Sequence, residues 1–324
     1  MNLYPLIKLL SNGHFHTGTQ LGLDLGVSRT AVWKQIQQLP NLGLEIITKK
    51  NDGYKLVKPL ELLDIEQIQG LFQEHNSSLT LNFYPSLDST NLELSRRCSD
   101  GSGLLNKQLM LVEKQTAGLG RRGRGWYSPY ASSLSMSLGF KVEGGANVLQ
   151  ALSLAVAVVI KRELETQGFV GIKLKWPNDL YFNDAKLGGI LIELKGDLAG
   201  PCSLIVGVGI NVYRTSNLPD LDQPISFLDD QQEAIINRSA LAANIALAIE
   251  KLVDSYPETG FEPYMEEWNQ AHLWKGMQSY IMTSKESIPV TLGGVTSTGE
   301  LEVVYESGEE GLINAGEVSL RPKK

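Results

Sequence analysis

The sequence AGLGRRGRGW at residues 117–126 sets three arginines among four glycines, directly after a strand-like run that ends near Glu113. Glycines let the backbone pass close to a ligand, and guanidinium groups bind carboxylate or phosphate through paired hydrogen bonds. The segment matches neither a P-loop nor a dinucleotide-binding GxGxxG turn. It therefore predicts an anion-binding loop that stays mobile until the anion arrives. On this segment alone, a flexible basic surface loop, or one that touches RNA, remains the alternative.

A lysine-bearing hairpin is the second polar segment. Residues 175–179, KWPND, form a turn at the end of a strand, and residues 185–194 contain the returning strand. This pattern predicts that Lys186 lies beside the turn, next to glycines that would let a substrate approach. A solvated hairpin lysine is the alternative.

Short polar side chains at residues 88–91, DSTN, form the third segment, after a strand-like run at residues 83–84. Such a row at a strand end can bind a small polar ligand. It can equally cap a helix over residues 91–97. Both interpretations stay open on this segment alone.

The N-terminal residues show the pattern of a winged helix-turn-helix. Apolar residues at helical spacing predict three helices, over residues 4–10, 19–25 and 29–39. Thr17 and Ser28 are suited to cap the second and third helices, and Gly26 to form the turn between them. Strand-like runs at residues 44–50 and 54–57 flank the turn sequence NDG, which predicts a hairpin that would be the wing.

The remaining residues predict an α+β protein of several parts. A linker helix is expected over residues 62–75, and a mixed sheet within residues 81–264. The expected strands are 109–113, 134–140, 172–176, 190–194 and 204–208, and the expected helices are 146–167 and 239–255. Residues 133–138 alternate between polar and apolar, which predicts a sheet with one solvated face. From residue 276 to 324, short strands broken by glycine predict a small barrel.

The charge of the chain is unevenly distributed. The 324 residues carry 29 Lys and Arg and 36 Asp and Glu, a net charge of −7, and the length suggests two or three domains. Such a total excludes a protein that coats nucleic acid along its whole length, because that needs a surplus of cations. Residues 1–58 alone have seven cations and three anions, a charge of +4, which leaves −11 for the rest.

The cysteines and the apolar segments favour a soluble cytoplasmic protein with no membrane association. Cys98 and Cys202 match no metal-binding or CxxC spacing, so reduced thiols are expected. The N-terminus has too short an apolar run for a signal peptide. Residues 148–160, the longest mostly apolar stretch, fall short of the ~18–20 residues that span a bilayer.

Taken together, the three polar segments and GVGINV at residues 207–212 occur in the order found in one family, and the chain resembles a biotin protein ligase. The helix-turn-helix makes it similar to the bifunctional kind, which also represses the biotin operon. The resemblance extends to GEVSLR at residues 316–321. It implies a winged helix-turn-helix over residues 1–60, a class II synthetase-like catalytic domain over 61–275 and an SH3-like barrel over 276–324.

The resemblance also implies the chemistry. The family activates biotin with ATP and Mg²⁺ to biotinyl-5′-AMP, then transfers biotin to a lysine of the biotin carboxyl carrier protein of acetyl-CoA carboxylase. By similarity, Lys186 and Arg121 would be catalytic, and Asp179 would bind Mg²⁺. The residues implied for biotin are Ser89, Thr90, Asn91, Gln115, Leu119, Gly120, Arg121 and Lys186. Those implied for the nucleotide are Arg122, Arg124, Trp126, Lys175, Asn178 and Asn211.

Two positions depart from the family pattern. Leu119 stands where closely related repressor ligases have an arginine, which is harmless only if that position acts through its backbone. Pro224 stands near the place of an adenine-capping tryptophan, and Phe227 is a candidate substitute.

The N-terminal unit is expected to bind operator DNA as a homodimer that forms when the adenylate is bound. The expected DNA-facing residues are Ser28, Arg29, Thr30, Lys34, Lys49 and Lys50. The four cations among them suit phosphate and groove contacts. A protein-docking winged helix is the alternative for this unit. For the whole chain, the alternatives are a ligase without repression, a regulator with an inactive effector domain, and a lipoate ligase.

Overall fold

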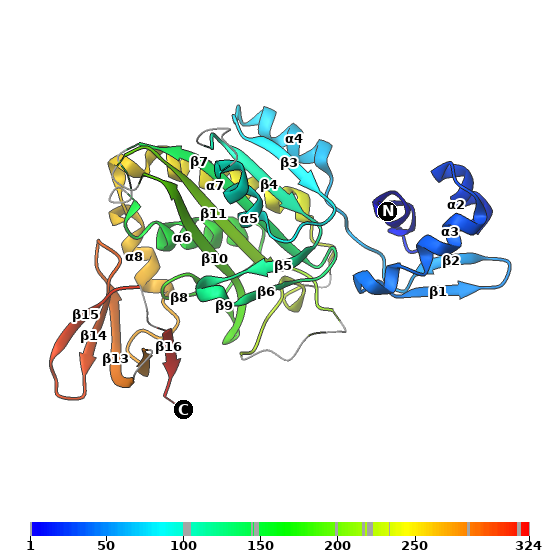
Figure 1. The fold of residues 1–324 in the computed structure, drawn as a ribbon. Coiled ribbons are helices and arrows are strands. Elements are labelled where there is room, and N and C mark those ends of the chain that lie inside the picture. The colour runs from blue at the N-terminus through cyan, green and yellow to red at the C-terminus, as the bar shows by residue number, and fades with distance from the viewer. Residues whose placement is uncertain are drawn as a thin grey trace.

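The computed structural model describes residues 2–99, 105–143, 145, 149–197, 200–215, 218, 223–232, 234–283, 286–315 and 319–323. Figure 1 shows three parts in chain order: a small helical part at the N-terminus, a central layered part around one sheet, and a smaller sheet at the C-terminus. Within the described residues, no helix is both long and apolar enough to cross a membrane.

The N-terminal part has the predicted order of elements. Its helices and strands are α1 (Tyr4–Leu10), α2 (Gly18–Leu25), α3 (Arg29–Ile36), β1 (Ile46–Lys49) and β2 (Gly53–Leu56). Thr17 and Ser28 accept hydrogen bonds as the N-caps of α2 and α3, and Gly26 ends α2 in the left-handed conformation. The predicted caps and turn are therefore confirmed.

The third helix is shorter than predicted. It ends at Ile36, and residues Leu39–Leu42 form a separate 3₁₀ helix (η1). Pro40 explains the difference, because proline has no N–H to donate and disfavours helical backbone at the preceding residue.

The central part is built on a seven-stranded mixed sheet in the order β3-β4-β7-β11-β10-β9-β8. Its strands are β3 (Thr80–Tyr84), β4 (Gln108–Val112), β7 (Ser133–Val142), β8 (Lys173–Lys175), β9 (Asp179–Phe182), β10 (Ala185–Gly196) and β11 (Cys202–Asn211). In the described part of this sheet, β3 and β4 pair in parallel and the other neighbouring strands pair antiparallel. The predicted mixed sheet is confirmed, although β9 was not foreseen as a separate strand.

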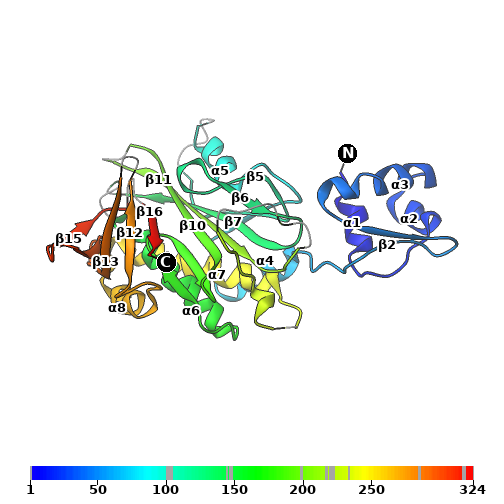
Figure 2. The same ribbon diagram turned by 90° about the horizontal axis from the view of Figure 1, so that it is seen from below.

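Helices cover the central sheet on both faces (Figure 2). The helices α6 (Leu152–Thr166) and α7 (Arg238–Thr259) pack on one face, with α4 (Ile65–Glu74) beside α7 and α8 (Glu262–Ala271) beside α6. The other face carries α5 (Thr90–Ser99) and a hairpin of β5 (Gln115–Leu119) and β6 (Gly125–Ser128). The first residues of the helix predicted over 146–167, residues 146–148, lie outside the described part.

The prediction that residues 133–138 present a solvated face is wrong. Ser133, Ser135 and Ser137 of β7 are all at most 1% exposed. They face the side of the sheet that α5 and the β5–β6 hairpin cover, where buried polar groups hydrogen-bond one another. Alternation of serine with apolar residues here marks a buried polar lining.

The C-terminal part is an antiparallel sheet in the order β15-β14-β13-β12-β16. Its strands are β12 (Gln278–Met282), β13 (Ser287–Val295), β14 (Leu301–Tyr305), β15 (Glu310–Ile313) and β16 (Ser319–Pro322). Within the described residues, no strand pairing joins β15 to β16, so the predicted closed barrel is not confirmed. Residues 316–318 of the GEVSLR motif lie outside the described part.

A buried ion network ties the segment after the N-terminal part to the central part. The guanidinium of Arg238, which has no exposed surface, contacts Glu113 Oε2 at 2.6 Å and Glu61 Oε2 at 3.0 Å. Glu113 is also fully buried, and its Oε1 accepts the Leu63 N–H at 2.7 Å. The linker is therefore held by paired charges at the end of β4.

The N-terminal part also touches the central part directly. Lys114 Nζ donates to the Leu42 carbonyl at 3.3 Å, at the end of η1. The rings of Tyr4 and Phe83 lie 5.5 Å apart, and Tyr130 packs into the apolar cluster of the N-terminal part. The cysteines are free thiols, as expected, with Cys202 buried.

Candidate functional site

A pocket of about 510 Å³ opens on the face of the central sheet that carries α5 and the β5–β6 hairpin. The start of α5, the hairpin, the β8–β9 turn, strands β10 and β11 and the C-terminal strand β16 all contribute to its lining. Every residue predicted for the ligand site lines this one pocket. Among the described residues of the lining there are six cations, Arg121, Arg122, Arg124, Lys175, Lys186 and Arg321, and one carboxylate, Asp179.

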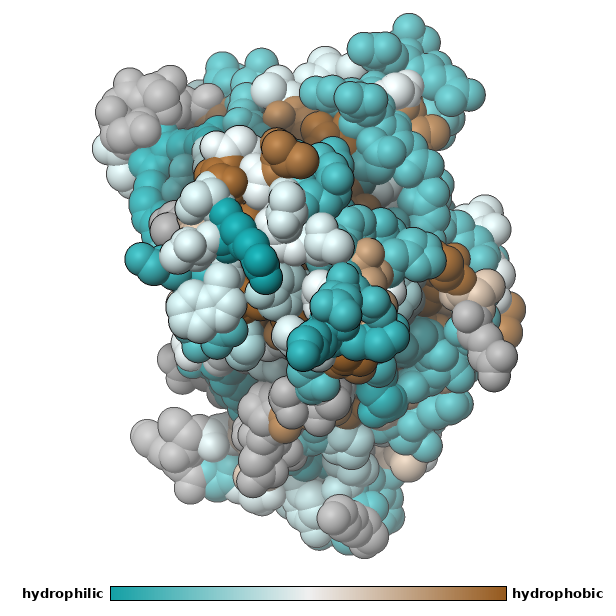
Figure 3. Space-filling view, turned by 90° about the vertical axis from the view of Figure 1, so that its right-hand side faces the viewer, coloured by the Kyte–Doolittle hydropathy of each residue, from teal (hydrophilic) through white to brown (hydrophobic). Residues whose placement is uncertain are grey.

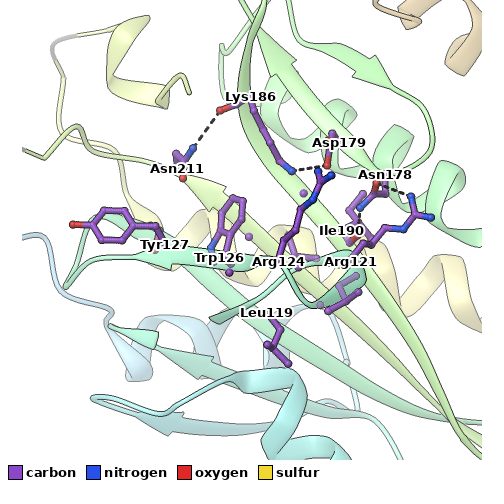
Figure 4. A pocket seen from close by; sticks show the side chains of 18 of the residues that line it. Leu119, Arg121, Arg124, Trp126, Tyr127, Asn178, Asp179, Lys186, Ile190 and Asn211 are labelled. Carbon is purple, nitrogen blue, oxygen red and sulfur yellow. Dashed lines mark hydrogen bonds and ion pairs between the residues drawn. The ribbon is translucent and has the colours of Figure 1, made fainter. Parts of the chain in front are cut away.

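Lys186 points across the pocket toward Asp179 (Figure 4), and Lys186 Nζ lies 2.7 Å from Asp179 Oδ1. The prediction that Lys186 lies beside the β8–β9 turn is therefore confirmed. Neighbouring backbone fixes the lysine, because its N–H donates to the Pro224 carbonyl and its carbonyl accepts the Ser226 N–H, each at 2.9 Å. Asn211 Nδ2 donates to the same Lys186 carbonyl at 3.3 Å.

Arg121 joins three parts of the molecule at the tip of the hairpin. Its Nη1 donates to Asn178 Oδ1 at 3.3 Å, and its Nη2 donates to the carbonyl of Ala315 in the C-terminal part. Burial lowers the pKa of Arg121 from its ordinary value, and Asp179 opposes that shift. Arg122 and Arg124 are exposed at the same turn, and Figure 4 shows Arg124 reaching toward Asp179.

The start of α5 serves both as a helix cap and as pocket lining. Ser89, Thr90 and Asn91 are all less than 5% exposed, and Ser89 Oγ lies 3.5 Å from the Leu92 N–H. Gln115 Oε1 accepts the Thr90 N–H at 2.8 Å, which ties the hairpin to α5. The DSTN sequence therefore begins a helix, as one interpretation predicts, and the same residues line the pocket, so ligand binding by them stays a prediction.

Both polar atoms of the Asn91 side-chain amide form hydrogen bonds. Its Oδ1 lies 2.5 Å from Ser137 Oγ, and its Nδ2 donates to Glu193 Oε2 at 2.9 Å. Neither Ser137 nor Glu193 was identified from the sequence. The regular serine alternation in residues 133–137 could have indicated the first, had a buried polar row been considered.

Two glycines of β11 make room for side chains that line the pocket. A Cβ atom on Gly207 would lie 2.2 Å from Asn91 Oδ1, and one on Gly209 would lie 2.5 Å from the Trp126 ring. Trp126 therefore lies directly against the sheet. Its indole N–H is buried and has no hydrogen-bond partner among the residues that the structure describes, so this donor is available to a ligand.

Lys175 is the buried cation of the pocket, 8% exposed. Burial is the main cause that lowers its pKa to about 8, the positive charges of Lys186, Arg321 and Arg124 add to the shift, and Asp179 opposes it. Lys175 Nζ donates to Tyr181 Oη at 3.2 Å and lies 4.7 Å from the centre of the Trp274 ring. An anion in the pocket would favour the charged form of this lysine.

Asp179 fits a metal ion that arrives with a nucleotide rather than a preformed metal cage. In the part of the chain that the structure describes, no three His, Cys, Asp or Glu side chains gather around a possible metal position. Mg²⁺ commonly uses one or two carboxylates together with substrate phosphates and water.

The two departures from the family pattern have structural counterparts. Leu119 pairs with Gly125 through the hairpin backbone, and Figure 4 shows its side chain directed away from Lys186. Pro224 contributes its carbonyl to Lys186, whereas Phe227 lines the pocket and lies 4.6 Å below the Arg214 guanidinium. Asp222, two residues before Pro224, lies outside the described residues.

The predicted DNA-facing residues lie together at the far end of the molecule. Ser28, Arg29, Thr30, Lys34, Lys49 and Lys50 are all exposed. Lys49 pairs with Asp52 at 2.5 Å, and Lys49 and Lys55 both lie over the ring of Phe15. Figure 3, which views the molecule from the N-terminal side, shows a largely hydrophilic face.

Comparison with known proteins shows which families the chain resembles. Residues 85–211 match the model of the "Biotin/lipoate A/B protein ligase family", and residues 3–55 match an "HTH domain" model. The bifunctional ligase/repressor BirA of Escherichia coli (strain K12) is 34% identical over 98% of this chain and 96% of its own. The protein of the same name from Bacillus subtilis (strain 168) is 29% identical over 96% of each chain.

Among solved structures, the biotin protein ligase from Aquifex aeolicus in complex with biotin and ATP superposes with a TM-score of 0.64 at 26% identity. The match covers 75% of this chain and 99% of that one.

Proposed function

The chain belongs to the family of bifunctional biotin protein ligases and repressors, and from that membership we propose which residues perform each step. As a biotin protein ligase, it forms biotinyl-5′-AMP from biotin and ATP and then transfers biotin to a lysine of a biotin carboxyl carrier protein. The observation that carries the assignment of the site is the pocket itself, in which, counting the described residues, six cations face one carboxylate.

In the first step, a carboxylate oxygen of biotin attacks the α-phosphorus of ATP, and the bond to pyrophosphate breaks. Both reactants are anions, so their approach requires cations. Lys186 and Arg121 are placed to offset that repulsion, because they extend from opposite walls of the pocket toward Asp179 and Asn178. The nucleophile is already ionised, so no general base is needed.

Asp179 would hold Mg²⁺, and the ion would supply positive charge beside the nucleotide phosphates. Lys175, Asn178, Asn211, Arg122, Arg124 and Trp126 would bind the nucleotide. Phe227 would lie against the adenine.

Ser89, Thr90, Asn91 and Gln115 would bind the ureido ring and the nearby chain of biotin. The fixed amide of Asn91 is consistent with this role, because its orientation is set before the ligand arrives. Leu119 and Gly120 would act through the hairpin backbone, and Trp126 would supply an apolar wall for the valeryl chain.

In the second step, a neutral lysine amine of the carrier protein attacks the acyl carbon of the adenylate. The C–N bond forms, the bond to AMP breaks, and the amine gives up one proton. The hairpin over the pocket would exclude water from the mixed anhydride until the carrier arrives.

For repression, biotinyl-5′-AMP would act as corepressor by promoting a homodimer through the central sheets. Residues 191–196 of β10 are consistent with this, because within the described residues they pair with β11 on one side and with no strand on the other. An open strand edge of this kind can pair with a second chain. Domain boundaries near residues 60 and 275 would then separate a DNA-binding, a catalytic and a C-terminal unit.

Incubation with biotin, ATP, Mg²⁺ and a purified carrier domain tests the ligase assignment. We expect one biotin per carrier domain by mass spectrometry, and Lys186→Ala should abolish adenylate formation while the circular dichroism spectrum is unchanged. Attachment of lipoate instead of biotin would overturn the substrate. An active Lys186→Ala variant would remove this lysine from the mechanism.

Binding to operator DNA, with and without biotin plus ATP, tests repression separately. The proposal predicts tighter binding and a dimer by analytical ultracentrifugation when both are present. Equal affinity under the two conditions would leave a ligase that does not repress.

A further inference from the structure

The helix α3 presents one large aromatic side chain to solvent. Trp33 is 52% exposed, whereas Trp176, Trp268 and Trp274 are at most 9% exposed and Trp126 lines the ligand pocket. Exposed tryptophan is uncommon because its indole loses much favourable burial. A function at this surface would explain its position.

Trp33 lies in the middle of the exposed face of α3. At 3.6 residues per turn, Arg29, Trp33 and Gln37 follow one another along one side of the helix, with Thr30 and Lys34 beside them. All five are exposed. Val32 and Ile36 occupy the opposite side and are buried in the N-terminal apolar cluster.

The neighbours of Trp33 favour nucleic acid over protein as its partner. A protein-docking face would continue the apolar surface along the helix. Here the other four exposed positions of the arc carry two cations, a hydroxyl and an amide. Lys49 and Lys50 extend the positive charge at the wing, in a part whose charge is +4. One aromatic side chain surrounded by cations and polar groups suits a DNA groove, which is lined by phosphates on both sides.

Within the major groove, the apolar group that a base edge offers is the C5-methyl of thymine. We propose that Trp33 reads a thymine methyl in each operator half-site, with Arg29 and Gln37 on either side of it toward neighbouring bases. The inference deepens the proposed DNA-binding function and rests on it. Trp33 thereby becomes a specificity-determining residue, distinct from the cations that position the helix on the phosphates.

The test uses the full chain with biotin and ATP, and a duplex selected with it from a random-sequence library. Each thymine of the selected site is replaced singly by deoxyuridine, which removes only the methyl group. For the unmodified chain, we expect one replacement per half-site to weaken binding roughly fourfold, the value of one buried methyl group. Trp33→Ala should weaken binding to the all-thymine duplex at least fourfold as well. In this variant, replacing the same thymine by deoxyuridine should have no further effect.

Two controls separate this role from others. Val57→Ala removes an exposed apolar side chain that faces the cleft between the N-terminal and central parts, and should keep the methyl response. The salt dependence of binding should be the same for Trp33→Ala as for the unmodified chain, because no phosphate contact is lost. Retained biotin transfer shows that the central part of the variant is folded, and an unchanged circular dichroism spectrum shows that the N-terminal helices are kept.

The outcomes distinguish the role of Trp33 from DNA binding by the N-terminal part as a whole. A selected duplex whose methyl response survives in Trp33→Ala, or that shows no methyl response at all, overturns the role of Trp33 and leaves DNA binding intact. Failure to select any duplex overturns both the repressor function and the inference.

Discussion

The close contact between Gly209 and Trp126 shows how a single atom can decide the shape of the ligand pocket. The main chain of β11 is extended at Gly209, so the constraint comes from space, since a Cβ would lie 2.5 Å from the indole ring. We expect Gly209→Ala to displace Trp126 and weaken binding of biotin and ATP, because the added methyl group overpacks the site, which typically costs about 1–3 kcal/mol of stability. Isothermal titration calorimetry measures this directly.

Gly70→Ala is the matched control for Gly209→Ala. Gly70 lies within α4, and a Cβ there would meet nothing within 4 Å. The change should leave ligand affinity unaltered and stabilise the fold by roughly 0.5–1 kcal/mol. If Gly209→Ala binds both ligands normally, Trp126 does not shape the pocket.

Lys175 predicts a pH dependence of nucleotide binding. In the free protein its pKa is about 8, mainly because of burial, and an anion in the pocket should raise it. Binding therefore takes up a proton when the pH lies between the free and bound pKa values. Affinity should fall as the pH rises above about 8.

Calorimetric titrations with ATP at pH values on either side of 8, in buffers of different ionisation enthalpy, measure that proton uptake. Lys175→Arg is the control, because arginine stays charged throughout this range and should remove the proton uptake. Unchanged uptake in that variant would assign the proton to another group.

At the scale of elements, helix caps and turns were predicted correctly, whereas the end of α3 and the element that covers the serines of β7 were not. The helix caps at Thr17 and Ser28 and the turn at Gly26 depend on neighbouring residues only, and all three were predicted. The serines of β7 were misread, because alternation reports that two faces differ and not which element covers the polar one.

In the candidate site, too, residues within local motifs could be predicted and residues positioned by distant contacts could not. Residues within recognisable motifs, such as Lys186 and Arg121, could be named from the sequence. Glu193 and Ser137 could not, because they gain their position only when β10, β7 and α5 meet at Asn91. Sequence alone gives no measure of such contacts between distant segments.

The buried ion pair of Arg238 with Glu113 is expected to contribute to the stability of the fold. Arg238→Met would leave Glu113 buried without its cation, at a cost of about 3–5 kcal/mol. The double variant with Glu113→Gln should recover part of that loss, because glutamine can still accept the Leu63 N–H. Urea unfolding of the full chain gives the differences in midpoint.

The surface pair of Arg162 with Glu267 provides the comparison. Arg162 is 46% exposed, so Arg162→Met should cost less than about 1 kcal/mol. Equal costs for Arg162→Met and Arg238→Met would show that burial does not distinguish the two pairs.

For the whole molecule, the distribution of charge predicts the salt dependence of DNA binding. If Arg29, Lys34, Lys49 and Lys50 each contact one phosphate, the slope of log K against log salt is roughly −4 for one copy and roughly −7 for two. The slope therefore reports how many copies bind the operator. Fluorescence anisotropy with a labelled duplex, in the presence of biotin and ATP, measures it.

A slope near −4 in the presence of the adenylate would contradict the proposed homodimer on DNA. Biotin transfer provides an internal reference, because Arg121, Lys175 and Lys186 of the catalytic pocket are buried or half-buried and should respond less to salt. A parallel loss of both activities with salt would indicate a general effect on the fold.

The β5–β6 hairpin is attached at both ends to other parts of the chain: Lys114 contacts Leu42 in the N-terminal part, and Arg121 contacts Ala315 in the C-terminal part. An insertion or deletion between residues 114 and 121 would shift one attachment point relative to the other. Length variation among natural homologues should therefore be rare within this segment, even though surface hairpins usually tolerate it. The same segment would be a poor place to insert a tag or to cut the chain for fragment complementation.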